Sequence, residues 1–328
     1  MILEASITVA VVAPYLLCQW LRVPLSASPS PFDLKLGAEP VPGCRLNKRI
    51  GRGGFGEVWE ASSTTDDTRL ALKFIDCKHQ NANLVVNEIK LLIQLRDLKH
   101  DNLLQFYSVT TGKNLIILSM ELAEGSLNDL HYIYRTDHRT HVPPDVLMNL
   151  MSQAAEGLDF IAQVKIANSN SLTQQGMQHC DIKPSNLLLI KNAVKVADFG
   201  LSGPQLWNAR GMAFGTPPYA PPELYEGRPN SRTDQYSLAV TYVELRTGYF
   251  PFPASKDGAP PTVAPELTML PEPERTVIAQ ALSKQWLNRY GNCREFVAAL
   301  ARVVEPGSKG LPYSRRSTPA HGTRGSKP

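Results

Sequence analysis

A glycine-rich turn early in the chain, from Gly51 to Gly56, limits the possible folds more than any other segment. Residues that favour strands flank it on both sides, Ile50 before it and Val58 to Ala61 after it. The glycines are therefore predicted to join two strands of a hairpin. In a dinucleotide-binding fold, glycines with this spacing lead into a helix instead. The segment that follows the turn argues against that fold.

Glycine has no Cβ, so a turn with glycine at positions 51, 53 and 56 lets backbone N–H groups come close to phosphate oxygens. The motif predicts a phosphate-binding turn built from Gly51, Gly53 and Gly56. Taken alone it is weak evidence, because a flexible surface hairpin that binds nothing has the same composition.

A lysine in the next predicted strand is the second chemical signal. Residues 70–75 read Leu-Ala-Leu-Lys-Phe-Ile, which places Lys73 among apolar neighbours. A buried ammonium group is costly without an anionic partner. The helical pattern of residues 85–92 supplies Glu88 beside its apolar stripe. We expect a Lys73–Glu88 pair that presents the ammonium group to phosphate oxygens; an ordinary surface salt bridge is the alternative.

Two polar loops in the second half of the chain carry the remaining chemistry. The first reads His-Cys-Asp-Ile-Lys-Pro-Ser-Asn over residues 179–186, and Asp198-Phe-Gly follows after a predicted hairpin. Asn186 and Asp198 offer hard oxygen ligands, which suit Mg²⁺ held together with phosphates. Asp181 can accept a hydroxyl proton, and Lys183 can neutralise a phosphoryl group. Each of these residues, taken singly, is also an ordinary turn residue.

These segments, in this order, resemble the eukaryotic-type protein serine/threonine kinase family, including its short bacterial members. The resemblance covers roughly residues 44–304. It implies an α+β fold of two lobes: a small, mostly β N-lobe (44–122) with one key helix, and a larger helical C-lobe (123–304). It also implies ATP and Mg²⁺ as cofactors and a protein substrate with a Ser or Thr acceptor.

The resemblance assigns roles to individual residues. It implies Asp181 as the catalytic base, with Lys183, Asn186, Lys73 and Glu88 completing the catalytic set, and Asn186 and Asp198 as the metal ligands. The nucleotide site that it implies is formed by Ile50, Gly51, Gly53, Gly56, Val58, Ala71, Lys73, Met120, Glu121, Ala123, Leu188 and Asp198.

Four further residues have structural roles implied by the resemblance. Glu223 is expected to pair with Arg289, and Asp234 to hold the backbone of the catalytic loop. Thr216 is expected to bond both Asp181 and Lys183, an arrangement of serine/threonine kinases.

The chain departs from the family at Cys180, where the family has an arginine that binds a phosphate on the activation segment. A cysteine cannot make that charge-assisted contact. Residues 203–215 also contain no Ser, Thr or Tyr. We therefore expect activity that needs no phosphorylation of this segment. A reactive role for the Cys180 thiol is disfavoured by the charge of neighbouring Asp181.

Charge and cysteine content exclude some other functions. The formal net charge is +4, and residues 305–328, with five basic residues and one acidic residue, account for all of it. The remainder is close to neutral, so no nucleic acid is expected as a partner. The five cysteines have no spacing typical of a zinc site or of a disulfide framework. Residues 305–328 are expected to form a basic, disordered tail.

Residues 1–43 are expected to form an extension made of an uncharged apolar stretch, 5–21, and a linker rich in Pro and Ser. The stretch is short for a membrane span. Three explanations stay open for this stretch: a membrane anchor, packing against the domain, or a translation start placed too early. The membrane anchor is possible but disfavoured. The expected location is the cytoplasm, with a membrane-anchored protein whose kinase domain is cytoplasmic as the alternative.

Two other functions share these motifs. A pseudokinase scaffold has the same fold without phosphate transfer, and a small-molecule kinase has the same lobes without the peptide-binding element at 215–223. The sequence does not identify the substrate, the pathway or the oligomeric state. It also gives no role for two apparent insertions that lengthen loops near 131–144 and 165–178.

Overall fold

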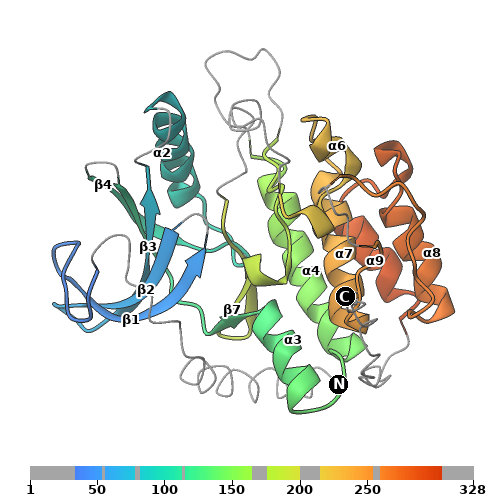
Figure 1. Cartoon of the computed structure of the whole chain (residues 1–328), viewed down its shortest axis with the longest axis horizontal. Coiled ribbons are helices and arrows are strands. Elements are labelled where there is room, and N and C mark those ends of the chain that lie inside the picture. Colours follow the sequence, from blue (N-terminus) through green and yellow to red (C-terminus); the bar gives the residue numbers. More distant parts are fainter. Residues whose placement is uncertain are drawn as a thin grey trace, which may run out of the picture.

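The structure is a computed structural model. It describes residues 34–53, 56–77, 82–112, 115–164, 176–199, 215–253 and 259–304. A strand-rich N-lobe and a helical C-lobe lie side by side (Figure 1), as the sequence predicted. The predictions for the apolar stretch 5–21, for most of the 165–178 insertion and for the tail fall outside the described residues.

The N-lobe is a five-stranded antiparallel sheet in the order β1-β2-β3-β5-β4. Its elements are β1 (Cys44–Gly53), β2 (Gly56–Ser63), β3 (Arg69–Asp76), α2 (Ala82–Asp97), β4 (Phe106–Gly112) and β5 (Leu115–Met120). Gly56 has a φ of +134°, and a Cβ there would lie 1.8 Å from the carbonyl oxygen of Phe74. Only glycine fits at this position, where β2 begins against β3.

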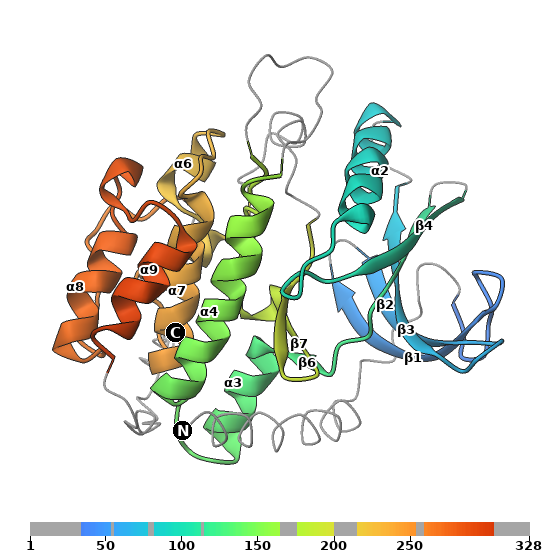
Figure 2. The same ribbon diagram turned by 180° about the vertical axis from the view of Figure 1, so that it is seen from behind.

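The C-lobe is built on two long central helices. Its helices are α3 (Leu127–Thr136), α4 (Pro144–Ile161), α6 (Pro222–Tyr225), α7 (Thr233–Thr247), α8 (Glu272–Ala281) and α9 (Cys293–Ala301). Helix α4 packs against α7 and α9, and α8 lies on the far side (Figure 2). Large side chains that are fully buried form the core of this lobe: Leu147, Leu150, Tyr236, Tyr242 and Phe296.

A small sheet stands where the two lobes meet. It pairs β6 (Gly125–Ser126) with β7 (Leu187–Ile190), and β7 with β8 (Ala193–Val196). Three short 3₁₀ helices lie in the same lobe: η1 (Pro184–Asn186), η2 (Pro217–Tyr219) and η3 (Trp286–Asn288).

The segment between α2 and β4 is attached to this small sheet. The backbone N–H of Val196 donates to the carbonyl of Asn102 at 2.9 Å, and that of Leu104 donates to the carbonyl of Val196 at 3.0 Å. The Asn102 side chain adds a bond to the carbonyl of Val194 at 3.0 Å. These bonds fix a connecting segment of the N-lobe to the C-lobe.

The prediction of a lengthened loop near 131–144 was wrong over its first part. Helix α3 continues to Thr136, so the connection to α4 is residues 137–143. A capping box starts the helix: Ser126 and Asp129 bond each other's backbone N–H. Leu130 and Ile133 then bury one face of it, which stabilises a helix in a segment that looked irregular.

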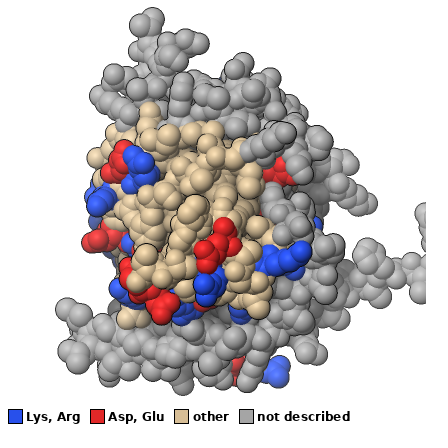
Figure 3. Space-filling model, turned by 90° about the vertical axis from the view of Figure 1, so that its left-hand side faces the viewer, with Lys and Arg blue, Asp and Glu red and all other residues tan. Residues whose placement is uncertain are grey.

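The surface of the N-lobe end carries charges of both signs. In Figure 3, acidic and basic side chains lie close together at the left and over the lower part of this face, and its upper part is largely uncharged. Within the ranges described above, no helix is both long and apolar enough to cross a membrane.

Two buried histidines on the C-lobe predict a dependence of stability on pH. The rings of His131 and His141 lie 5.8 Å apart, and each residue is at most 4% exposed. Burial lowers the pKa of both imidazoles to about 4, and the charge of Arg135 adds to the effect on both. Because the pKa in the folded protein lies below the unfolded value of about 6.5, the unfolded chain binds more protons than the folded protein between about pH 4 and 6.5.

We therefore expect the free energy of unfolding to fall as the pH drops from about 6.5 toward 4. Each histidine should contribute a loss of roughly 1–2 kcal/mol between pH 7 and 5. The measurement is urea unfolding at both pH values for the wild type and for His131→Gln, which cannot take up the proton. An equal loss in the two proteins would contradict this prediction.

Candidate active site

A cavity of about 200 Å³ lies between the lobes, under the glycine-rich turn. Its walls come from β1, β2 and β3 above, from the segment after β5 at the back, and from β7 and the residues after β8 below. The residues predicted for the nucleotide site that line it are Ile50, Gly51, Val58, Ala71, Lys73, Met120, Glu121, Ala123, Leu188 and Asp198.

Gly53 and Gly56 of the predicted set do not line the cavity. They face each other at the ends of β1 and β2, where the strand register pairs them directly. They close the hairpin above the cavity, and residues 54 and 55 between them are outside the described part.

Several apolar cavity residues were missed by the sequence analysis, among them Leu92, Phe106, Leu118 and Phe199. Two of them could have been found from their positions in the sequence. Leu118 lies two residues before Met120 on the same strand, and so shares its face. Leu92 lies four residues after Glu88 on α2, on the same side of the helix.

Within the described residues, Lys73 forms an ion pair with Asp198. The Lys73 Nζ atom lies 2.6 Å from Asp198 Oδ1, which joins β3 of the N-lobe to the segment after β8. Burial alone would raise the pKa of Asp198, but the ammonium group outweighs it and the pKa is lowered. The Glu88 side chain on α2 lies outside the described part of the structure, so the Lys73–Glu88 pair stays a prediction.

The carboxylate of Asp181 is the centre of a polar cluster on the floor of the cleft. Lys183 Nζ lies 2.9 Å from its Oδ2 atom, and Thr216 Oγ1 donates to its Oδ1 atom at 2.7 Å. Lys183 Nζ also donates to Thr216 Oγ1 at 2.6 Å, so the three side chains form a closed triangle. The expected bonds of Thr216 to Asp181 and Lys183 are confirmed.

Asn186 links this cluster to the cavity. Its Nδ2 atom donates to the backbone carbonyl of Asp181 at 2.8 Å and to Oδ2 at 3.1 Å. Asn186 and Asp198 both line the cavity. The structure thus brings Lys73, Asp181, Asn186 and Asp198, which are far apart in the sequence, to one region of the cleft.

The backbone of the catalytic loop is held by a buried carboxylate, as expected. Asp234 in the first turn of α7 accepts hydrogen bonds from the N–H groups of His179 at 2.7 Å and Cys180 at 2.8 Å. Burial raises the pKa of Asp234, against the lowering effect of these bonds. The Nε2 atom of His179 lies 2.9 Å from the carbonyl of Ala197, which ties the loop to the segment that carries Asp198.

Cys180 is a packing residue in this loop. It is 1% exposed and lies in a small apolar cluster with Ala220 and Leu224. Its φ is +66°, and its backbone N–H donates to Asp234 in this conformation. Burial, followed by the charges of Asp234 and Glu223, raises the pKa of the thiol well above its ordinary value. A thiolate is therefore disfavoured here, as the sequence predicted.

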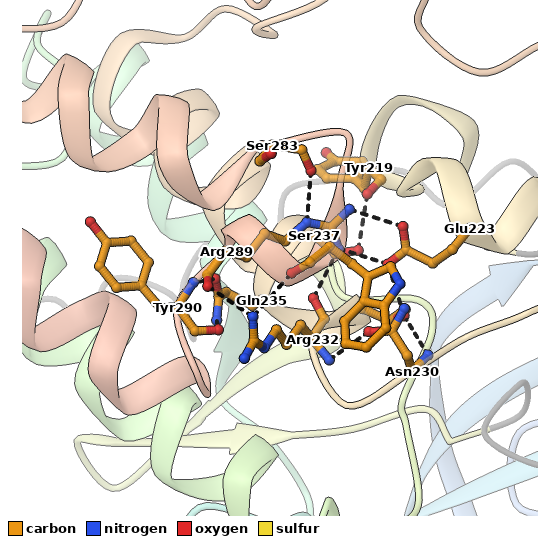
Figure 4. Close-up of polar contacts among 11 residues, drawn as sticks. Tyr219, Glu223, Asn230, Arg232, Gln235, Ser237, Ser283, Arg289 and Tyr290 are labelled. Carbon is orange, nitrogen blue, oxygen red and sulfur yellow. Dashed lines mark hydrogen bonds and ion pairs between the residues drawn. The ribbon is translucent and has the colours of Figure 1, made fainter.

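The expected Glu223–Arg289 pair is confirmed, and it anchors residues 215–223 to the C-lobe (Figure 4). The two Nη atoms of Arg289 lie 2.7 and 2.9 Å from the two carboxylate oxygens of Glu223. Arg289 Nε donates to the carbonyl of Ser283 at 2.9 Å, and Nη1 donates to that of Arg232 at 3.1 Å. The pair is bidentate, and Glu223 also accepts a hydrogen bond from Thr233 at 3.0 Å.

The donor set fits Mg²⁺. The amide nitrogen of Asn186 is held by two oxygens of Asp181, which leaves its carbonyl oxygen as the ligand atom. Lys73 occupies one oxygen of Asp198, and the other carboxylate oxygen remains for a cation. Mg²⁺ is often bound by one or two protein oxygens together with phosphates and water. Asn186 and Asp198 suit that arrangement.

Comparison with known proteins agrees with the geometry. The sequence pattern of the family described as "Protein kinase domain" matches residues 44–301. CBL-interacting serine/threonine-protein kinase 7 of Arabidopsis thaliana is 31% identical over 224 residues, which are 65% of this chain and 48% of that protein. Serine/threonine-protein kinase PknA of Corynebacterium glutamicum is 27% identical over 280 residues, 79% of this chain and 56% of that protein. The chain spans about half the length of these two relatives.

The solved kinase domain of Mycobacterium tuberculosis PknI has the same fold, with a TM-score of 0.63 and 21% identity. The match covers 83% of this chain and all of that domain. The two-lobed fold and the mainly apolar cavity between the lobes agree with this match. The chain belongs to the protein kinase family, whose members generally use ATP and Mg²⁺.

Proposed function

We propose that this protein is an active serine/threonine kinase that transfers the γ-phosphoryl group of ATP to Ser or Thr hydroxyls of proteins. The observation that carries the proposal is the closed triangle of Asp181, Lys183 and Thr216 beside a cavity lined by Lys73 and Asp198. The kinase domain would extend over residues 44–304, and the protein would act in the cytoplasm.

Each residue has a distinct role in the proposed phosphate transfer. Lys73 and the amides of the glycine-rich turn hold the phosphates, and Asp181 orients the acceptor hydroxyl and takes its proton. Lys183 stabilises the charge on the transferring group. Asn186 and Asp198 would hold Mg²⁺, which would neutralise charge on the phosphates. Positioning and electrostatics provide most of the rate enhancement, because the transition state is loose.

The test is transfer of labelled phosphate from ATP to generic peptides that contain Ser, Thr or Tyr, followed by identification of the phosphorylated residue. Incorporation at Ser or Thr that the Asp181→Asn variant lacks supports the proposal. Binding of ATP without any transfer would favour a pseudokinase scaffold. Transfer to a small molecule but to no peptide would favour a small-molecule kinase.

We also propose that activity is independent of phosphorylation of the activation segment. Cys180 packs in an apolar cluster with Ala220 and Leu224, and its thiol cannot make the charge-assisted contact with a phosphate that an arginine makes. The sequence of residues 203–215 offers no hydroxyl acceptor.

Treatment of the purified protein with a broad-specificity phosphatase is therefore expected to leave the rate of peptide phosphorylation unchanged within about twofold. The measurement is the initial rate before and after treatment, with loss of phosphate followed by mass spectrometry. Collapse of the rate on dephosphorylation would show that the activity depends on a phosphate.

A further inference from the structure

Glu57 carries a fully buried carboxylate that phosphate transfer does not use. It follows the last glycine of the turn, on β2. Its Oε2 atom accepts a hydrogen bond from Trp59 Nε1 at 3.1 Å. Its Oε1 atom lies 3.6 Å from Nη1 of Arg49 and 3.8 Å from Nε of Arg52. One carboxylate therefore connects two arginines of β1 to β2.

The position of these ion pairs relates them to the glycine-rich turn. The strand register places Arg52 directly opposite Glu57, and Arg52 is itself part of the turn. Neighbouring residues of a strand point to opposite faces, so Glu57 points away from the face on which Val58 lines the cavity. The ion pairs therefore connect β1 to β2 beside the turn, on the face opposite to the cavity.

Stability alone does not account for a charge at this position. A buried carboxylate is costly to desolvate even when cations face it, and an apolar residue in such a place is often neutral or stabilising. In the part of the chain that the structure describes, no donor hydrogen-bonds to Oε1 of Glu57. Its attraction to Arg49 and Arg52 is purely between charges. What these pairs determine is the position of the turn.

We propose that Glu57 is a positioning residue for the nucleotide: through Arg49 and Arg52 it holds the glycine-rich turn over the phosphate site before ATP binds. A turn that is already held in place loses less conformational freedom when the ligand binds, so the affinity is higher. This inference rests on the proposed function only in requiring that the cavity takes ATP.

The test compares Glu57→Gln with Glu60→Gln, which each remove one carboxylate charge from β2. Glu60 pairs with Arg69 at 2.7 Å, further along the strand from the turn. Glutamine at 57 keeps an oxygen for the Trp59 indole. We expect Glu57→Gln to raise the Kd of a fluorescent ATP analogue and the KM for ATP about three- to tenfold, with kcat changed less than about twofold. Glu60→Gln should match the wild type in all three.

Arg52→Gln gives an independent test that does not disturb a buried site, because the Arg52 side chain is 40% exposed. It should raise the Kd by a similar factor. The double variant should bind no more weakly than Glu57→Gln alone, since the Arg52–Glu57 pair is already lost in that single variant.

A Kd within about twofold of the wild type in Arg52→Gln, or an equal rise in Glu60→Gln, would overturn the inference. Binding of the ATP analogue requires no phosphate transfer, so failure of this inference can be distinguished from failure of the proposed function. A wild type that binds ATP but transfers nothing would contradict the proposed function alone, and one that binds no ATP would contradict both.

Discussion

Replacing Asp181 with asparagine is expected to lower kcat for peptide phosphorylation by a factor of about 10²–10⁴, the usual contribution of a positioned general base. Asparagine has nearly the same shape and keeps an oxygen for the Thr216 hydroxyl, but it cannot take a proton from the acceptor. Asp181 is not among the residues that line the cavity. The affinity for ATP should therefore stay close to that of the wild type.

The measurement is steady-state kinetics with direct titration of a fluorescent ATP analogue. A kcat at the wild-type level would show that another group takes the proton. A parallel loss of ATP affinity would show instead that the substitution disturbs Asn186, whose amide bonds Asp181 twice. Thermal unfolding serves as the control for folding.

Replacing Arg289 with methionine is expected to lower the free energy of unfolding by about 3–5 kcal/mol. The Arg289 side chain is fully buried, and its loss leaves the Glu223 carboxylate, 8% exposed, without its cation. Glu223 keeps only a hydrogen bond from Thr233 at 3.0 Å in the described network. A buried carboxylate without a countercharge is strongly destabilising.

Arg294→Met is the matched control, because it removes an exposed arginine of the same region whose buried partner, Asp159, keeps hydrogen bonds from the backbone N–H groups of Cys293 and residue 294 at 2.9 and 3.0 Å. Arg294 Nε lies 3.0 Å from Asp159, but the Arg294 side chain is 59% exposed. Because water can replace an exposed guanidinium group and Asp159 keeps its two backbone donors, the loss should be about 1 kcal/mol. Urea unfolding of both variants should show the difference, and equal losses would mean that burial does not decide the strength of the Glu223–Arg289 pair.

Much of the site could be predicted from the sequence because local patterns carry it. The strand alternation around Lys73 and the polar loops at Asp181 and Asp198 each fix a local conformation, and a family resemblance places them together. The structure adds partners that no local pattern contains. The bond from Lys73 to Asp198 spans 125 positions along the chain, and the Glu57 pairs depend on a register shift within β1.

The error at 131–144 has a similar physical origin. The segment contains His, Tyr, Arg and Thr, which reads as a polar loop, yet α3 continues to Thr136. Its helical state depends on the capping box at Ser126 and on burial of Ile133 against the rest of the C-lobe. Tertiary packing determines where such a helix ends, and residue type alone does not.

The bonds of Asn102 and Leu104 to β8 have a mechanical consequence for the whole molecule. They give the N-lobe a second attachment to the C-lobe, in addition to the chain that runs from Met120 to Glu124. Once the Lys73–Asp198 ion pair across the cleft is broken, two bodies joined at these two backbone connections move most easily by rotation about the line through both of them. Opening of the cleft to admit and release nucleotide should follow that axis, so the front edge of the glycine-rich turn would travel furthest while the floor of the cavity stays still.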